Sequence, residues 1–268
     1  MKCFIHLICD YAPGDLAWAE VYSAMASKLP SDVGMHFTSV GSFDTIATGF
    51  VLGQLALADK DLRPENLVVF ANCAPRKDKK EARDNNAGEG LMYGLLNNGV
   101  RILAVNSGFS MSFVREKLSE LWAVDVEEEG SQFRSRDFFP RALGRLINED
   151  KNFKTRLLNP MDVIRDYPEE VIGYIDSFGN LKTTIRGNDA SIAGLNAGSR
   201  IKVRIGTVLR TATVATGSFN VMEGDLAFAP GSSGHENRFW EFFQRGGSAS
   251  AEFGHPHVGS NIVIEHVS

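Results

Sequence analysis

The order of apolar segments along residues 1–167 is the feature that most restricts the fold of this chain. Short apolar runs typical of strands alternate with runs of about 10 to 15 residues at helical spacing. This alternation predicts an α/β domain with a mostly parallel sheet, and ligands bind such sheets beyond the carboxyl ends of the strands. The expected strands are 4–9, 36–40, 67–74 and 101–107, and the expected helices are 16–29, 45–58 and 109–122.

The sequence changes character after DYPEE, residues 166–170. Short segments of alternating apolar and polar residues follow, separated by Gly, Asn and Asp. This pattern is typical of a small antiparallel barrel or sandwich. We therefore expect two domains, an α/β domain over 1–167 and an all-β barrel domain over 168–268.

Charge and cysteine content argue against several classes of function. The formal net charge of −5 disfavours a nucleic-acid partner, which needs a broad basic surface. Three cysteines without zinc-site spacing favour reduced thiols in the cytoplasm. The apolar run 4–9 meets Asp10 at once, so it is too short for a signal-peptide core or a membrane span. HPH at 255–257 lacks the cysteines or clustered carboxylates of a metal site, and we expect no metal.

Two aspartates, Asp10 and Asp15, lie in one loop after the first expected strand. Their carboxylates could bind ribose hydroxyls or an ammonium group. Alternatively, they are a helix cap and a solvated loop residue, because Asp is favoured in both places. The basic segment 74–86 follows another strand and is either a solvated charge run or a loop that faces an anion.

Four loops have compositions that suit a binding site. YIDSFGN (174–180) combines Asp, an aromatic residue and Gly-Asn, a pair suited to positive φ. GSSGH (231–235) and QRGGSASAEFG (244–254) could let the backbone approach a ligand closely. Taken alone, these three are also typical of ordinary turns. GSQFRSRDFFPRAL (130–143) leads into a helix and offers three arginines but no obvious base.

Together these segments, in this order, resemble the S-adenosyl-L-methionine (SAM) hydroxide adenosyltransferase family, which includes the fluorinase and chlorinase enzymes. VIGYIDSFGNLKTTI is similar to the family's Ile-Asp-x-Phe-Gly-Asn-x-x-Thr-Asn-Ile signature, and CDYAPGD to its Asp-Phe-Gly-x-x-Asp loop. GSFD, AVNSG, GSSGH, RGGSA and FRSRDFF stand where the family has further binding segments. The resemblance covers nearly the whole chain.

The resemblance implies an α/β domain followed by a β-barrel, assembled as a homotrimer with SAM between one subunit's N-terminal domain and its neighbour's C-terminal domain. SAM or adenosine would be substrate or ligand, without another cofactor. Asp10 would hold the ribose diol, Phe43 would flank the ribose, and Asp15 with Asp176 would bind the methionine ammonium. Ser232 would meet the methionine carboxylate. The expected adenine frame is Phe178, Asn180, Arg245 and Gly247, and Asn106 and Phe133 complete the expected substrate contacts.

The sequence departs from the family where hydrolytic members activate water. The family's Asp-Pro becomes Ala74-Pro75 and its loop His becomes Arg134, while Ser135 falls where the fluorinase has a halide-contacting serine. The expected nucleophile-facing residues are Arg134, Ser135 and Lys77. Hydrolysis to adenosine and L-methionine, with water oriented by another group, is the preferred hypothesis. Halide-dependent adenosyl transfer and binding without turnover are the alternatives, and the candidates for orienting water are Asp78, Glu81 and Asp84.

Overall fold

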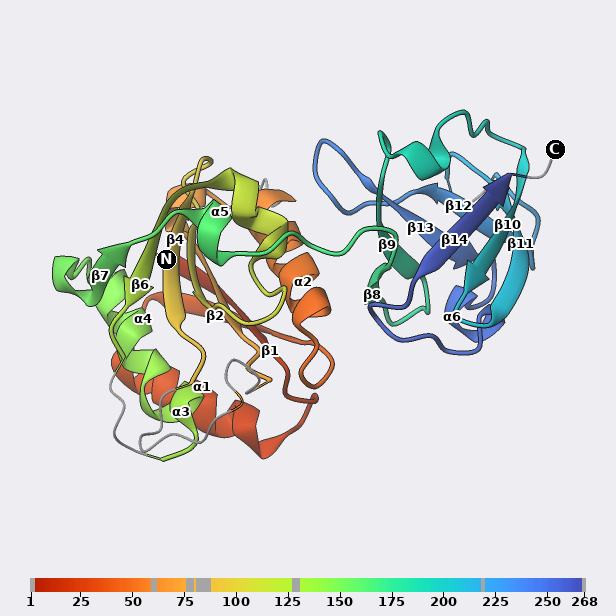
Figure 1. The fold of residues 1–268 in the computed structure, drawn as a ribbon. Coiled ribbons are helices and arrows are strands. Elements are labelled where there is room, and N and C mark those ends of the chain that lie inside the picture. The colour runs from red at the N-terminus through yellow and green to blue at the C-terminus, as the bar shows by residue number, and fades with distance from the viewer. Residues whose placement is uncertain are drawn as a thin grey trace. The chain divides into compact units, whose positions relative to one another are not determined.

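A computed structural model describes residues 3–58, 62–75, 80, 88–126, 131–217 and 220–266. The chain forms two compact units, Met1–Asp166 and Tyr167–Ser268, whose elements are labelled in Figure 1. Within the described residues, none of the helices has the length and apolar character that a membrane crossing requires.

The first unit is built on a seven-stranded sheet in the order β2-β1-β3-β5-β4-β6-β7. Strands β2, β1, β3 and β5 are parallel neighbours, and β3 is buried along its whole length, as expected for a strand covered on both faces. The strands are β1 (Cys3–Cys9), β2 (Val33–Ser39), β3 (Leu67–Asn72), β4 (Leu91–Leu96), β5 (Arg101–Val105), β6 (Leu118–Val124) and β7 (Lys154–Leu157).

The expectation of a mostly parallel sheet is only partly correct, because the sheet is mixed. β4, β6 and β7 pair antiparallel. Residues 97–100 alone link β4 to β5, which is too short for the crossover of about a dozen residues that a parallel pair needs. The α/β class holds, with parallel strands confined to the half of the sheet that begins at β2.

The prediction of a helix over residues 109–122 is wrong. Ser112–Lys117 forms a short 3-10 turn, η2, and Leu118–Val124 is strand β6. Pairing with β4 satisfies the backbone of this segment, and Gly94 of β4 has no side chain where Leu118 packs. Tertiary pairing thus overrides the helical spacing of the apolar residues.

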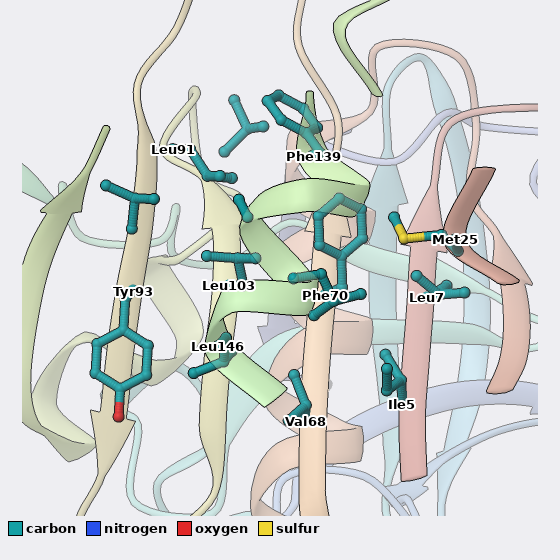
Figure 2. Packing of buried hydrophobic residues seen from close by; sticks show 14 of the residues in the cluster. Ile5, Leu7, Met25, Val68, Phe70, Leu91, Tyr93, Leu103, Phe139 and Leu146 are labelled. Carbon is teal, nitrogen blue, oxygen red and sulfur yellow. The ribbon is translucent and has the colours of Figure 1, made fainter. Parts of the chain in front are cut away.

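Helices cover both faces of this sheet (Figure 1). α1 and α4 pack together on one face, and α2 packs against β1 and β3 on the other. Figure 2 shows the core under α1 and α4, where Met25 and Leu146 lie over Leu7, Phe70 and Leu103 of the strands. The helices and turns are α1 (Leu16–Lys28), α2 (Thr45–Ala58), η1 (Pro64–Asn66), α3 (Arg134–Asp137), α4 (Phe139–Ile147), η3 (Lys151–Phe153) and α5 (Pro160–Val163).

The second unit is a curled seven-stranded sheet in the order β14-β10-β11-β12-β13-β9-β8. Its two edges meet at a bridge between Val171 and Asn261, and Phe228 and Phe242 stack in its core. It differs from the expected all-β antiparallel barrel in two ways: β11 and β12 pair parallel, and it contains η4 (Ala190–Ile192) and α6 (Ala249–Glu252). The strands are β8 (Ile172–Ile175), β9 (Leu181–Arg186), β10 (Arg200–Ile205), β11 (Val208–Val214), β12 (Leu226–Pro230), β13 (Phe239–Gln244) and β14 (Ile262–His266).

Candidate functional site

The carboxyl ends of β1, β3 and β5 lie side by side because these strands are parallel neighbours. Asp10 follows β1, Cys73 follows β3, and Ser107 lies just beyond β5. The Ser107 hydroxyl donates to the Cys73 carbonyl and so ties two of these ends together. This edge is where ligands bind in open α/β sheets.

Asp10 and Phe43 are brought together at this edge. The backbone N–H of Phe43 donates to Asp10 Oδ2 at 3.0 Å. Phe43 has φ 60°, and the residue is 59% exposed. A bulky residue rarely adopts this left-handed conformation, and such strain clusters at functional sites.

The turn that holds Phe43 is fixed from its other side by α2. Asp44 Oδ1 accepts the Ala47 N–H at 2.9 Å, and the Thr48 hydroxyl donates to the Asp44 carbonyl at 2.7 Å. Burial raises the pKa of Asp44, although its hydrogen bonds from the helix backbone oppose that rise. Phe43 is thus presented by a turn anchored both to Asp10 and to the start of α2.

Asp15 makes the contacts expected of a helix cap. It is the N-cap residue of α1, and its Oδ1 accepts the Ala17 N–H at 2.8 Å. A capping carboxylate retains further acceptor positions. The capping contact therefore explains its position in the loop, and the ammonium contact remains an expectation.

Tyr11 links three segments that are distant in the sequence. Its hydroxyl lies 2.5 Å from Ser135 Oγ in α3 and accepts the Asn72 side-chain N–H at 2.9 Å. Ser135 and Asn72 are buried. Ser135 was predicted from the sequence, whereas Tyr11 and Asn72 were missed, although Asn72 lies within the expected strand 67–74 and is the last residue of β3, and Tyr11 adjoins Asp10.

The hydroxyls of this cluster are neutral donors. Burial raises the pKa of Tyr11, and the neighbouring Cys9 raises it further. Because Asn72 donates to the phenol oxygen, the Tyr11 proton can go to Ser135, which leaves the Ser135 proton for a third group. The three residues can therefore orient a ligand or water, but none of them is a base at neutral pH.

Two buried thiols lie behind Asp10. Burial raises the pKa of both Cys9 and Cys73, and the Asp10 carboxylate raises each further. Both are therefore neutral at physiological pH. In the part of the chain that the structure describes, His, Cys, Asp and Glu side chains do not converge in threes as metal ligands do.

Arg134 and Phe133 adjoin the Tyr11 cluster. Arg134 Nη1 donates to the Glu89 carbonyl at 3.2 Å, and its guanidinium lies 5.4 Å from the centre of the Phe139 ring. The Phe133 ring meets the Tyr11 ring edge to face at 6.1 Å. Arg134 thus has a packing contact that the sequence did not predict.

Other expected residues of the first unit are less informative. The Asn106 side-chain amide donates to the Val163 carbonyl at 2.9 Å and so contacts α5. Four residues named as nucleophile-facing or water-orienting candidates lie outside the described residues, namely Lys77, Asp78, Glu81 and Asp84.

In the second unit, the turn YIDSFGN is organised around the Asp176 carboxylate. Oδ1 accepts the backbone N–H groups of Phe178 and Asn180, each at 3.0 Å, and Oδ2 accepts the Asn180 side-chain N–H at 3.0 Å. Gly179 has φ 80°, which is why this position favours glycine. The turn leaves the Phe178 side chain 78% exposed.

The three loops of the second unit that the sequence analysis selected lie next to one another. Ser250 N–H donates to the Gly179 carbonyl at 2.8 Å, which joins the last loop to YIDSFGN. Gly231 of GSSGH packs on Glu241, since a Cβ there would lie 2.7 Å from Glu241 Oε2. Glu241 in turn forms an ion pair with Lys182, which lies two residues after the end of YIDSFGN.

Within these loops, Ser232 is exposed and Arg245 Nη1 donates to the Val221 carbonyl at 2.8 Å. Gly247 needs its lack of a side chain, because a Cβ would lie 2.0 Å from Gln244 Oε1. Phe178 and Ser232 are exposed, so an aromatic ring and a hydroxyl are available to contact a planar or polar ligand.

Comparison with known proteins shows the fold. No protein-family model and no curated protein sequence matches the chain. An uncharacterized conserved protein from Thermotoga maritima matches with a TM-score of 0.74 at 19% identity, over 97% of this chain and 100% of that one. A conserved hypothetical protein from Thermus thermophilus matches with a TM-score of 0.68 at 18% identity, over 99% and 100%. At these identities, the likeness concerns the fold alone.

Proposed function

We propose that the protein binds S-adenosyl-L-methionine and catalyses nucleophilic displacement at the ribose 5′ carbon, with water as the nucleophile. The pairing of Asp10 with the strained, exposed Phe43 is the observation that supports this most. A carboxylate suits a vicinal diol, and an aromatic ring suits the apolar side of a sugar. Asp10 directly follows β1, and Phe43 lies in the loop after the neighbouring parallel strand β2.

The loops of the second unit support the remaining contacts of this proposal. Asp176 Oδ2 has one hydrogen bond from Asn180, so it retains acceptor capacity for the methionine ammonium. Phe178 is available to stack on adenine because its side chain is exposed. The resemblance assigns these loops to a neighbouring subunit, and we propose a homotrimer with one ligand for each pair of neighbours.

The proposed reaction places few chemical demands on the protein. The C5′–S bond breaks with its electron pair going to sulfur, so the sulfonium leaves as the neutral thioether of L-methionine. Water oxygen forms the C5′–O bond of adenosine and loses a proton to solvent. Because the leaving group needs no acid, catalysis reduces to alignment of a desolvated water. The Ser135 hydroxyl, oriented by Tyr11 and Asn72, is suited to that task.

Incubation with SAM tests the proposal directly. We expect micromolar or tighter binding of SAM and adenosine by calorimetry, and a rise in melting temperature, because a ligand at a hundredfold excess over its Kd stabilises the native state by about 2.7 kcal/mol. Chromatography should then detect adenosine and L-methionine.

The other outcomes of this experiment are equally specific. A 5′-halogenated adenosine formed only with added halide would replace water by halide as the nucleophile. If SAM binds but is recovered unchanged, the protein binds SAM without turnover. No heat and no thermal shift with millimolar SAM and adenosine would overturn the assignment.

The proposed assembly has its own measurement. Light scattering should give the mass of three 29.4 kDa chains, since each site is completed by loops from a neighbour. A monomer that binds SAM with full affinity would contradict the trimer without contradicting SAM binding.

A further inference from the structure

Lys182 lies between two carboxylates at the base of the YIDSFGN turn. Its Nζ is 2.7 Å from Glu241 Oε2 and 3.7 Å from Asp176 Oδ2. The three side chains are largely buried, with exposures of 14% for Lys182, 17% for Glu241 and 20% for Asp176. Lys182 thus makes a short, charge-assisted contact with Glu241 and none of that kind with Asp176.

The register of the strand pair determines which carboxylate Lys182 contacts at short range. Lys182 of β9 and Glu241 of β13 face each other across an antiparallel pair. Gly231 packs on the Glu241 carboxylate, since a Cβ there would lie 2.9 Å from Glu241 Cδ. Glu241 therefore has little freedom to move away, and it holds the Lys182 ammonium 2.7 Å from its own carboxylate, 1.0 Å closer than the 3.7 Å that separates this ammonium from Asp176 Oδ2.

The charges of this group do not balance. Two carboxylates and one ammonium leave one negative charge among side chains that are mostly shielded from water. Buried charge is costly unless it is paired. Asp176 Oδ2, with one hydrogen bond from Asn180, is where a second cation can bind.

We propose that Glu241 is a positioning residue, which takes the short contact of the Lys182 ammonium and so leaves Asp176 Oδ2 open for a ligand ammonium. This inference rests on the proposed function and gives the site a preference: a nucleoside that carries a primary ammonium binds more tightly than the nucleoside alone. Without Glu241, Lys182 can shorten its 3.7 Å contact with Asp176 Oδ2 to a hydrogen-bonded ion pair and so compete with a ligand ammonium.

Calorimetry with two ligands on four proteins tests this inference. The proteins are the wild type, Glu241→Gln, Lys182→Met and the double variant, and the ligands are SAM and adenosine. In Glu241→Gln we expect SAM to bind at least about tenfold more weakly, the loss of one charge-assisted hydrogen bond. Adenosine lacks the ammonium, so its Kd should stay within about twofold.

The double variant separates positioning from mere structural support. Once Lys182 is removed, its ammonium no longer competes for Asp176, so SAM affinity should return to within about threefold of the wild type. Lys182→Met alone should bind SAM at least as tightly as the wild type, and this result is informative even if Glu241→Gln does not fold. A loss of SAM affinity in Lys182→Met, or no recovery in the double variant, would overturn the inference.

Failure of the inference can be distinguished from failure of the proposed function. If the wild type binds neither SAM nor adenosine, both the proposed function and the inference that rests on it are refuted. If all four proteins bind adenosine and also bind SAM with one common affinity, nucleoside binding stands and the role of Glu241 is refuted.

Discussion

Asp10→Ala is expected to weaken the binding of both SAM and adenosine by about 10- to 100-fold while the unit stays folded. A charge-assisted hydrogen bond to the ribose contributes on the order of 1.5 to 3 kcal/mol. The substitution also releases the Phe43 N–H from Oδ2 and so loosens the turn that presents the aromatic ring. Calorimetry measures the affinity, and circular dichroism during thermal unfolding measures the fold.

Two variants serve as controls for Asp10→Ala. Asp10→Asn can still accept the Phe43 N–H but lacks the charge, so an intermediate loss would separate the two effects. Asp15→Ser keeps an N-cap side chain on α1 while removing the nearby carboxylate. We expect it to leave adenosine affinity unchanged. If Asp10→Ala binds adenosine as the wild type does, the carboxylate serves only to hold the Phe43 turn.

The predictable parts of the fold are those that the local periodicity of apolar residues indicates. The helices expected at 16–29 and 45–58 form as Leu16–Lys28 and Thr45–Ala58. The segment 109–122 was mispredicted because its apolar spacing fits a helix, whereas its backbone pairs with β4. The spacing of apolar residues in a segment does not indicate which strand will pair with that segment.

The same limit applies to the candidate site. The YIDSFGN turn was identifiable because the residues that Asp176 contacts lie within four positions of it. Asp10 was identifiable because it directly follows an expected strand. Tyr11 was missed because its partners, Asn72 and Ser135, are 61 and 124 residues away. Glu241 was missed for a similar reason, since it pairs with Lys182 across 59 residues. The functions of such residues follow from contacts that form only on folding.

Tyr11→Phe is expected to slow adenosine release from SAM by about tenfold or more, with adenosine affinity changed by less than about twofold. Without the phenol, the Ser135 hydroxyl loses the partner that orients it, which acts on the reaction rather than on ground-state binding. The variant also leaves the Asn72 N–H without its acceptor, so stability should fall by about 1 to 3 kcal/mol. Tyr93→Phe is the control, because Tyr93 is a buried tyrosine of the same unit, whereas Tyr11 is half-buried, and Tyr93 lies on β4 outside the cluster.

The pH dependence of the same reaction distinguishes orientation from base catalysis. Burial raises the pKa of Tyr11, Cys9 and Cys73, so each stays protonated and neutral below its raised pKa. Acids with raised pKa values add no titration step at lower pH, and we expect the rate of adenosine release to be flat between about pH 6 and 9. A rate that rises with pH through one ionisation in that interval would reveal a base elsewhere. An unchanged rate in Tyr11→Phe would remove the hydroxyl cluster from the reaction, because the phenol is the group through which Asn72 and Ser135 are joined.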